Sequence, residues 1–226
     1  MIKDLLSLIY PQVCVICPED LYKEEKFICS ECRYHLPRTG FHHVADNPVV
    51  KHFWGRIPVE AATAYFYFNK GLKAQELIHK VKYRGNTELG IYLGNMFGAE
   101  LKDSPFSEKI NLVIPVPLHE RKLKKRGYNQ SFLIAKGIAE AFGIEYSADY
   151  LIRSVATSTQ TRKSRFKRWE NVENKFDVTN EEAMKDKHIL LVDDVVTTGS
   201  TLEACAKAIL NVPGTKISIA ALASTQ

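Results

Sequence analysis

Residues 189–202 read ILLVDDVVTTGSTL. This stretch runs from a short apolar segment through two acids and two aliphatic residues to five small residues. The acids are Asp193 and Asp194, the aliphatic residues are Val195 and Val196, and the small residues are Thr197, Thr198, Gly199, Ser200 and Thr201. A short apolar run is typical of a buried strand, and the pattern that follows at residues 201–210 is helical. The stretch therefore predicts a strand, a tight turn and a helix.

The small residues at the start of this helix predict an anion site. Backbone N–H groups at a helix N-terminus have no partner within the helix, and the helix dipole adds partial positive charge there. Gly199 lets a ligand approach the backbone closely, and the hydroxyls add hydrogen-bond donors. We therefore expect a phosphate to bind at residues 197–201. The alternative is an ordinary capped turn, which fits the whole run of acids, hydroxyls and glycine poorly.

Asp193 and Asp194 would by themselves repel a phosphate. They fit a ligand that also carries vicinal hydroxyls and a metal ion, because carboxylates accept hydrogen bonds from ribose hydroxyls and bind Mg²⁺. Neighbouring residues of a strand point to opposite faces, so the two acids should have different partners. One is expected to face the ribose and metal, and the other a neighbouring backbone or loop.

The remaining segments after residue 56 alternate between apolar strands and helical patterns. Strands are expected at residues 61–68, 111–116, 150–153, 188–192 and 216–222, and helices at 72–83, 89–101, 129–142 and 201–210. In the third helix, capped by Asn129 and ended by Gly143, the inward residues are expected to be Phe132, Leu133, Ala135, Ile138, Ala139 and Phe142. The alternation predicts an α/β fold, a parallel sheet flanked by helices on both faces. Ligands of such sheets bind beyond the carboxyl ends of the strands.

Basic residues crowd two segments that we expect to be loops. The first cluster contains Arg121, Lys122, Lys124, Lys125 and Arg126, and the second Arg162, Lys163, Arg165, Lys167 and Arg168. The net charge of the chain is only +5, so the clustering favours a polyanionic ligand, with two solvated faces as the alternative. The second cluster lies in a long polar stretch, residues 154–175. We expect a lid there, and the alternatives are a surface arm or a nucleic-acid contact.

Four of the five cysteines form two C-x-x-C pairs. They are Cys14, Cys17, Cys29 and Cys32. Two such turns facing each other present four thiolates in a tetrahedron, which suits Zn²⁺, and four protein ligands make the zinc structural. The alternatives are disulfides and a redox-active pair. A cytoplasmic location argues against disulfides, and a redox-active pair does not explain two matched C-x-x-C pairs. The fifth, Cys205, is expected to be a buried core thiol.

These segments together resemble a known family. Residues 189–202 are similar to the phosphoribosyl pyrophosphate (PRPP) motif of type I phosphoribosyltransferases. The chain resembles the ComF group, which is associated with bacterial competence and DNA uptake and commonly joins a four-Cys module to this domain. The likeness extends to residues 113–131, VIPVPLHERKLKKRGYNQS, and to Gln160, Arg168, Asn171 and Phe176. It implies a type I phosphoribosyltransferase-like domain at residues 56–226, preceded at 1–55 by a small zinc-ribbon-like module and its connection.

The resemblance also implies an activity, the transfer of a phosphoribosyl group from PRPP to a nitrogen nucleophile with Mg²⁺. By position, Asp193 and Asp194 would contact the ribose and act in catalysis, and Thr197 to Thr201 would hold the 5′-phosphate next to Val195 and Val196. The resemblance places residues 118–121, with Leu118, His119 and Arg121, at the pyrophosphate. Lys122 and Arg126 would add positive charge for the leaving group, and Arg162 and Arg168 belong to the expected lid.

A binding module without turnover is the rival interpretation. Such a domain would sense PRPP, or bind single-stranded DNA or DNA-uptake machinery through its basic segments. The composition, 45% hydrophobic and 25% charged, is that of a soluble globular protein, and the sequence has no apolar run of the roughly 20 residues that a membrane helix needs. Residues 1–12 fit a short amphipathic helix better than a signal peptide, so we expect a cytoplasmic protein. The sequence identifies neither the acceptor nor the oligomeric state.

Overall fold

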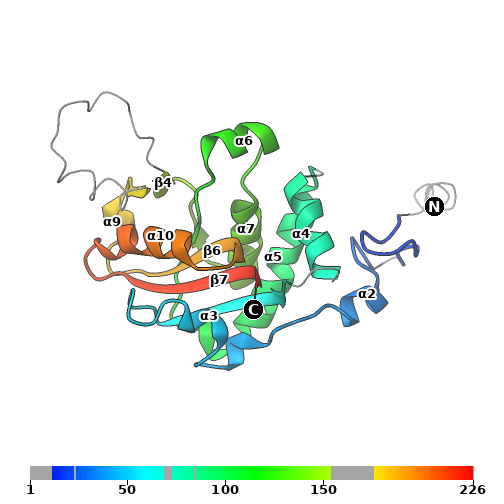
Figure 1. The fold of residues 1–226 in the computed structure, drawn as a ribbon, viewed down its shortest axis with the longest axis horizontal. Helices are drawn as coiled ribbons and strands as arrows, with labels where there is room; N and C mark the ends of the chain where they lie inside the picture. The colour runs from blue at the N-terminus through cyan, green and yellow to red at the C-terminus, as the bar shows by residue number, and fades with distance from the viewer. Residues whose placement is uncertain (1–11, 23, 69–72, 84, 154–175, 226) are drawn as a thin grey trace.

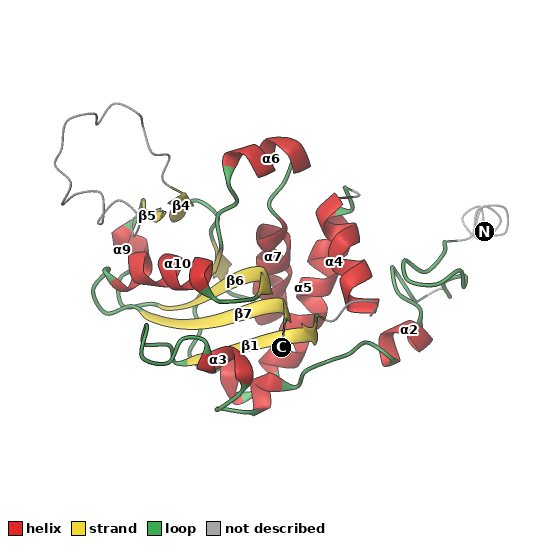
Figure 2. Cartoon of the chain, viewed as in Figure 1, coloured by secondary structure: helices red, strands yellow, loops and turns green. Residues whose placement is uncertain are grey.

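The computed structural model describes residues 12–22, 24–68, 73–83, 85–153 and 176–225. Its centre is a parallel sheet of five strands in the order β1-β7-β6-β2-β3 (Figures 1 and 2). The strands are β1 (Ala61–Tyr67), β2 (Leu112–Pro115), β3 (Glu145–Tyr146), β6 (His188–Val196) and β7 (Lys216–Ser224). A separate antiparallel pair joins β4 (Leu151–Arg153) to β5 (Phe176–Val178).

Helices cover both faces of this sheet. Apolar residues of β6 alternate between two cores, with Leu190 and Val192 in one and Ile189 and Leu191 in the other. The first core is packed by α4 (Lys73–Tyr83), α5 (Thr87–Lys102) and α7 (Gln130–Phe142). The second is packed by α3 (Pro48–Lys51), α9 (Glu181–Met184) and α10 (Ser200–Leu210). The predicted α/β fold with a parallel sheet flanked by helices is therefore confirmed.

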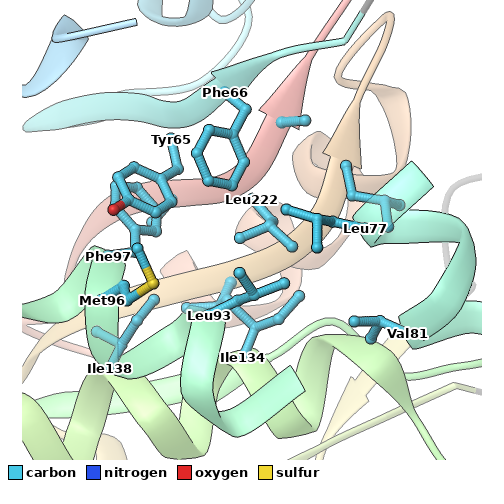
Figure 3. Packing of buried hydrophobic residues seen from close by; sticks show 14 of the residues in the cluster. Tyr65, Phe66, Leu77, Val81, Leu93, Met96, Phe97, Ile134, Ile138 and Leu222 are labelled. Carbon is cyan, nitrogen blue, oxygen red and sulfur yellow. The ribbon is translucent and has the colours of Figure 1, made fainter. Parts of the chain in front are cut away.

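The first core is built from large side chains of strands and helices that interdigitate (Figure 3). The ring of Tyr65 on β1 stacks on that of Phe97 on α5, with 4.7 Å between the ring centroids. Helices α5 and α7 pack very closely, since a Cβ atom added at Gly94 would overlap the backbone carbonyl of Ile134. Glycine at this crossing brings the two backbones together and so fixes α7 against the sheet.

The helix expected at residues 129–142 is present, with some differences in detail. Asn129 caps α7 by accepting a hydrogen bond from the Ser131 N–H, and Gly143 ends the helix with a φ of 72°. Ile134 is fully buried, whereas Phe132, predicted to face inward, is only half-buried and lies against the ring of Tyr146. Phe142, also predicted inward, is likewise half-buried at the last turn.

Two other expectations for local structure were incomplete. The strand expected at 188–192 continues to Val196, because residues beyond Val192 still pair with β7. The strand at 150–153 exists as β4, but it pairs antiparallel with β5 and lies outside the parallel sheet. Propensity alone cannot assign a short strand to a sheet, because its partner lies far away in the sequence.

The prediction that the first basic cluster lies in a loop was wrong. Residues 120–126 form a helix, α6 (Glu120–Arg126), which stands away from the sheet at the top of Figure 1. The side chain of His119 caps it by accepting from the Arg121 N–H at 3.1 Å, and Gly127 ends it with a φ of 80°. The residues between are strong helix formers, so about two turns with good caps are enough to order them.

The N-terminal part of the described chain contains the short helices α2 (Ser30–Tyr34), η1 (Phe41–His43) and α3. A second 3-10 turn, η2 (Pro105–Ser107), follows α5. The amphipathic helix expected at the N-terminus falls largely on residues 1–11, outside the described residues, as do the second basic cluster and the lid at 154–175. Among the helices of the described residues, none has the length and apolar character needed to cross a membrane.

Candidate functional site

The carboxyl ends of β2 and β6 lie next to each other in the sheet. Pro115 pairs with Val192, and the Val116 N–H donates to the Val192 carbonyl at 2.8 Å. The loop after β2 and the acid pair after Val192 therefore begin side by side. The start of α7 joins them, because Asn129 Nδ2 donates to the Val116 carbonyl at 2.9 Å. Three segments thus meet where β2 and β6 end, and α/β proteins bind ligands beyond the carboxyl ends of such strands.

Asp193 is held by two hydrogen bonds in a poorly solvated position. The Ser131 hydroxyl on α7 donates to Asp193 Oδ1 at 2.9 Å, and the Asp194 N–H donates to the same oxygen at 2.8 Å. Burial, followed by the neighbouring Asp194 charge, raises the pKa of Asp193 from 3.8 to about 7. This carboxyl group changes its charge near neutral pH, which is common for acids at functional sites.

Asp194 has a different partner, as expected for neighbouring strand residues. Its Oδ2 atom lies 2.9 Å from Lys82 Nζ on α4, and both side chains are mostly shielded from solvent, at 18% and 22% exposed. The Lys82 cation also helps to lower the pKa of Asp193, against the larger effect of burial. The two acids are therefore connected to two different helices, Asp193 to α7 and Asp194 to α4.

One acid of the pair and the residues that follow the pair line a small open hollow at the start of α10. The lining residues are Asp193, Val195, Val196, Thr197, Thr198, Gly199, Ser200, Thr201 and Leu202. Gly199 has a φ of 74° and precedes the first residue of α10, and the flanking Thr198 and Ser200 are exposed. The structure therefore brings the predicted phosphate-binding residues together around one hollow at a helix N-terminus.

The residues predicted to hold pyrophosphate are only partly brought together. Arg121 and Lys122 are exposed on α6, and the His119 side chain serves as the cap of that helix. Arg126 is engaged elsewhere, because its Nη1 donates to Gln130 Oε1 at 2.5 Å and its guanidinium lies 5.0 Å from the centre of the Tyr83 ring. Leu118, half-buried, lies in the loop after β2, and Arg162 and Arg168 fall outside the described residues.

The four cysteines predicted as metal ligands form one cluster. The sulfur atoms of Cys14, Cys17, Cys29 and Cys32 all lie within 4.8 Å of one another. Backbone N–H groups point at them, since those of Ile16 and Cys29 each donate to Cys14 Sγ at 3.4 Å. This is the arrangement of a four-thiolate metal site.

The thiols of this cluster differ in how readily they lose a proton, and Lys73 Nζ lies 3.6 Å from Cys32 Sγ. Burial acts to raise the pKa of Cys14, but the N–H groups of Cys29 and Ile16 lower it to about 7. Burial and the neighbouring thiols instead raise the pKa of Cys32 to about 12. Four thiolates together would carry more negative charge than Lys73 offsets, and a divalent metal ion among them would add the missing positive charge.

Several residues at this site had no marked pattern in the sequence. Lys82 and Ser131 lie at ordinary helical positions, and only the fold brings them to the acid pair. Arg56, in the segment before β1, contacts the Thr198 carbonyl at 3.3 Å and forms an ion pair with Glu203. Only Ser131 could have been found from the sequence. It lies two residues after the predicted cap Asn129, at the helix start that follows the strand at residues 111–116.

Residues 129–226 match the family model described as Phosphoribosyl transferase domain. The chain is 28% identical over 209 residues to the DNA utilization protein YhgH of Escherichia coli (strain K12), covering 91% of this chain and 87% of that protein. It is 24% identical over 227 residues to the Competence protein ComFC of Bacillus subtilis (strain 168), covering 89% and 90%. It is also 29% identical over 135 residues to Competence protein F of Haemophilus influenzae, covering 58% and 59%. The chain is therefore a homologue of proteins named for competence and DNA utilization, and it contains a phosphoribosyl transferase domain.

The chain thus has the type I phosphoribosyltransferase-like fold that the sequence predicted, with four cysteines clustered in its N-terminal region. Among solved structures it is similar to the glutamine PRPP amidotransferase of B. subtilis, with 20% identity and a TM-score of 0.46. That match covers 64% of this chain and only 30% of the amidotransferase. It is also similar to an adenine phosphoribosyltransferase, with 14% identity, a TM-score of 0.39, and coverage of 66% and 74%.

Proposed function

We propose that this chain binds PRPP together with Mg²⁺ and transfers its phosphoribosyl group to a nitrogen nucleophile in the cytoplasm. The observation that carries the proposal is the acid pair at the end of β6, followed at once by the hollow at the start of α10. The acids can accept hydrogen bonds from ribose hydroxyls, and the helix N-terminus can bind the 5′-phosphate. The two features follow each other along the chain as the ribose and its 5′-phosphate follow each other in the ligand. The family match of residues 129–226 supports the same ligand class.

In this proposal Asp193 and Asp194 accept hydrogen bonds from the ribose hydroxyls, and residues 195–201 surround the 5′-phosphate. The carboxylates fit Mg²⁺, a hard cation that prefers oxygen ligands, and Mg²⁺ would offset the charge of the leaving pyrophosphate. The bond from ribose C1 to the pyrophosphate oxygen breaks and a bond from C1 to the nitrogen forms, while the nucleophile loses a proton. Leu118, His119, Arg121, Lys122 and Arg126 remain the proposed pyrophosphate residues, with Arg162 and Arg168 in the proposed lid.

The four-cysteine cluster is proposed to hold a structural Zn²⁺. The cluster fits this metal because all four donors are sulfur atoms that lie within 4.8 Å of one another, and Zn²⁺ prefers four thiolates in a tetrahedron. With four protein ligands the metal would have no open coordination position, so its contribution would be to folding. The division into a zinc-ribbon-like module and connection at 1–55 and a phosphoribosyltransferase-like domain at 56–226 belongs to the same proposal.

A second candidate function is binding of single-stranded DNA without turnover. It is favoured by the exposed basic helix α6, whose Arg121, Lys122, Lys124 and Lys125 all face solvent. The names of the relatives, DNA utilization protein and competence proteins, point to a setting in DNA uptake for those proteins. Such binding would depend steeply on salt, because it rests on phosphate contacts.

Calorimetric titration with PRPP, with and without Mg²⁺, tests the first proposal. The wild-type protein is compared with a variant that carries Asp193→Asn and Asp194→Asn. Magnesium-dependent binding that the double variant loses is the expected result, and incubation with candidate nitrogen nucleophiles then tests for pyrophosphate release. If the wild-type protein ignores PRPP but binds a single-stranded oligonucleotide in a salt-dependent manner, the second candidate replaces the first.

A further inference from the structure

The segment before β1 packs against the phosphate-binding loop. Its position is fixed by Asn47, which is 3% exposed and whose Oδ1 accepts from the N–H groups of Val49 and Val50 at 2.9 and 3.1 Å. Asn47 Nδ2 also donates to the Ala62 carbonyl of β1 at 2.7 Å. This segment is therefore attached to the sheet and can serve as a rigid support.

Phe53 and Arg56 extend this support to the loop. The Phe53 side chain is fully buried, and its ring lies so near Gly199 that an added Cβ atom would come within 3.0 Å of it. Arg56 Nη1 donates to the Thr198 carbonyl at 3.3 Å and to the His52 carbonyl at 3.0 Å, while Nη2 pairs with Glu203 of α10. One guanidinium thus joins the support, the loop and the helix that follows the loop.

The contact with Thr198 has a consequence for the direction of the next N–H group. In a trans peptide the carbonyl and the following N–H point in opposite directions. Because Arg56 draws the Thr198 carbonyl to itself, the Gly199 N–H of the same peptide must point away from Arg56. The Arg56 contact thereby fixes the direction of a backbone donor at the start of α10, where a phosphate would be bound.

Arg56 also compensates a charge that would repel a phosphate. Glu203 lies in the first turn of α10, next to the proposed anion site, and its side chain is only 15% exposed. Arg56 pairs with its Oε2, and Lys207 Nζ lies 3.0 Å from its Oε1. Without these cations the carboxylate would counter the favourable field of the helix N-terminus.

We propose that Arg56 is a positioning residue that sets the shape and charge of the phosphate loop from outside the site. The inference rests on the proposed function, because its ligand is the 5′-phosphate of PRPP. It makes the segment that links the cysteine module to the sheet a part of the binding machinery. Arg56 acts through Thr198 and Glu203 and does not itself contact the ligand.

Three ligands and matched variants test this inference by calorimetry on the full chain. The ligands are PRPP with Mg²⁺, ribose 5-phosphate, and pyrophosphate with Mg²⁺. Arg56→Met should lower the affinities for PRPP and for ribose 5-phosphate by about tenfold each and leave the affinity for pyrophosphate unchanged. A tenfold loss is in the range expected for one hydrogen bond to a charged group. Lys207→Met is the control, because it removes a cation from the same carboxylate without touching the loop, and it should change each affinity less than about threefold.

The outcomes separate the inference from the function on which it rests. If wild-type protein binds PRPP and Arg56→Met binds it equally well, the inference is wrong and the function stands. Equal losses in Arg56→Met and Lys207→Met would also overturn it, because the loss of either cation beside Glu203 would then explain the effect and the Arg56 contact with Thr198 would contribute nothing. If the wild-type protein binds ribose 5-phosphate but not PRPP, and Arg56→Met lowers the affinity for ribose 5-phosphate, the inference stands and the proposed function fails. Binding of neither sugar phosphate by the wild-type protein would overturn both.

A folding control accompanies these titrations. Thermal unfolding shows whether Arg56→Met is folded at the temperature of the titration. Should it not be, Arg56→Lys is used instead, since lysine keeps the charge but cannot donate to Thr198 and pair with Glu203 through one planar group. Arg56→Lys should then bind ribose 5-phosphate with lower affinity than the wild type, and its affinity for pyrophosphate should again be unchanged. Wild-type affinity in Arg56→Lys would overturn the inference.

Discussion

The ammonium group of Lys82 lies 2.9 Å from Asp194 Oδ2. This ion pair ties α4 to the acid pair at the end of β6, and α4 is also linked to α6 by the stacking of Arg126 on Tyr83. The cation therefore belongs to the electrostatics of the site, although it lies more than a hundred residues from the acids in sequence. Its effect can be measured through the titration of Asp193.

Replacing Lys82 with methionine should shift the pH dependence of PRPP binding upward. Lys82 is one of the groups that lower the pKa of Asp193, so its loss should raise that pKa above about 7. At pH 7 more of Asp193 would be protonated, and the affinity for PRPP with Mg²⁺ should fall several-fold but recover as the pH rises above 8. Calorimetry between pH 6 and 9 measures this, with Lys136→Met as a variant of equal charge on α7. Identical pH midpoints in Lys82→Met and wild type would contradict it.

Asn at position 193 should stabilise the free protein at alkaline pH. Native Asp193 holds its proton up to about pH 7, whereas the unfolded chain releases it near 3.8. The native state therefore binds more protons between these values, and the contribution of Asp193 to stability falls as pH rises from about 4 to 7. The advantage of Asp193→Asn over wild type should grow by on the order of 2 kcal/mol between pH 5 and pH 8.

Urea unfolding at the two pH values measures that difference. Asp194→Asn is the matched variant, and its gain should be smaller, because it removes the charge that adds to the effect of burial on the pKa of Asp193 but leaves that burial in place. It also removes the partner of the Lys82 cation, which should destabilise the protein at both pH values. A constant difference between Asp193→Asn and wild type at both pH values would mean that Asp193 titrates normally in the folded protein.

Alanine at position 199 should weaken phosphate binding more than its backbone strain explains. Both Gly199 and Gly143 have φ values near 70°, which costs an alanine roughly 1 kcal/mol. A Cβ atom would meet open space at Gly143 but the Phe53 ring at Gly199. Gly199→Ala should therefore destabilise the protein more than Gly143→Ala and reduce the affinity for ribose 5-phosphate, which Gly143→Ala should leave unchanged. Equal effects of the two variants on stability and binding would show that the loop is not supported by Phe53.

The core of the fold could be predicted because its strands and helices carry their own periodicity. The run from Ile189 to Val192 and the helix that begins at Asn129 are decided by local pattern and capping, and they appear where expected. The helix at Glu120–Arg126 was missed because six of its seven residues are exposed and it carries no apolar stripe, so only its caps mark it. The pairing of β4 with β5 was missed because it is a contact between segments separated in the sequence.

The residues of the candidate site likewise fall into those that a sequence motif marks and those that it does not. Its acids, its small hydroxylated residues and its cysteines form continuous or evenly spaced motifs, and the structure brings each group together. Lys82, Ser131 and Arg56 come from three other elements and have no motif. Their roles depend on tertiary packing, which no local pattern encodes. Residues that tune or support a site are thus harder to predict from sequence than residues that would contact the ligand.

Removal of metal should unfold the cysteine segment and loosen the face of the main domain on which it packs. Cys14, Cys29 and Cys32 belong to the first core, and Phe27 lies 5.3 Å from the ring of Tyr92 on α5. A short segment with so little core of its own depends on its metal for folding.

The purified protein should contain one zinc ion per chain, and chelation should speed amide hydrogen exchange in residues 12–35 and along α4 and α5. Strands β6 and β7 should keep their protection, because they lie at the centre of the sheet between two cores. Cys17→Ser should lose the zinc, whereas Cys205→Ala should retain it, since Cys205 lies in the second core, apart from the cluster. Unchanged exchange in residues 12–35 after chelation would mean that their folding does not depend on metal, and loss of protection throughout the sheet would mean that the two parts fold as one unit.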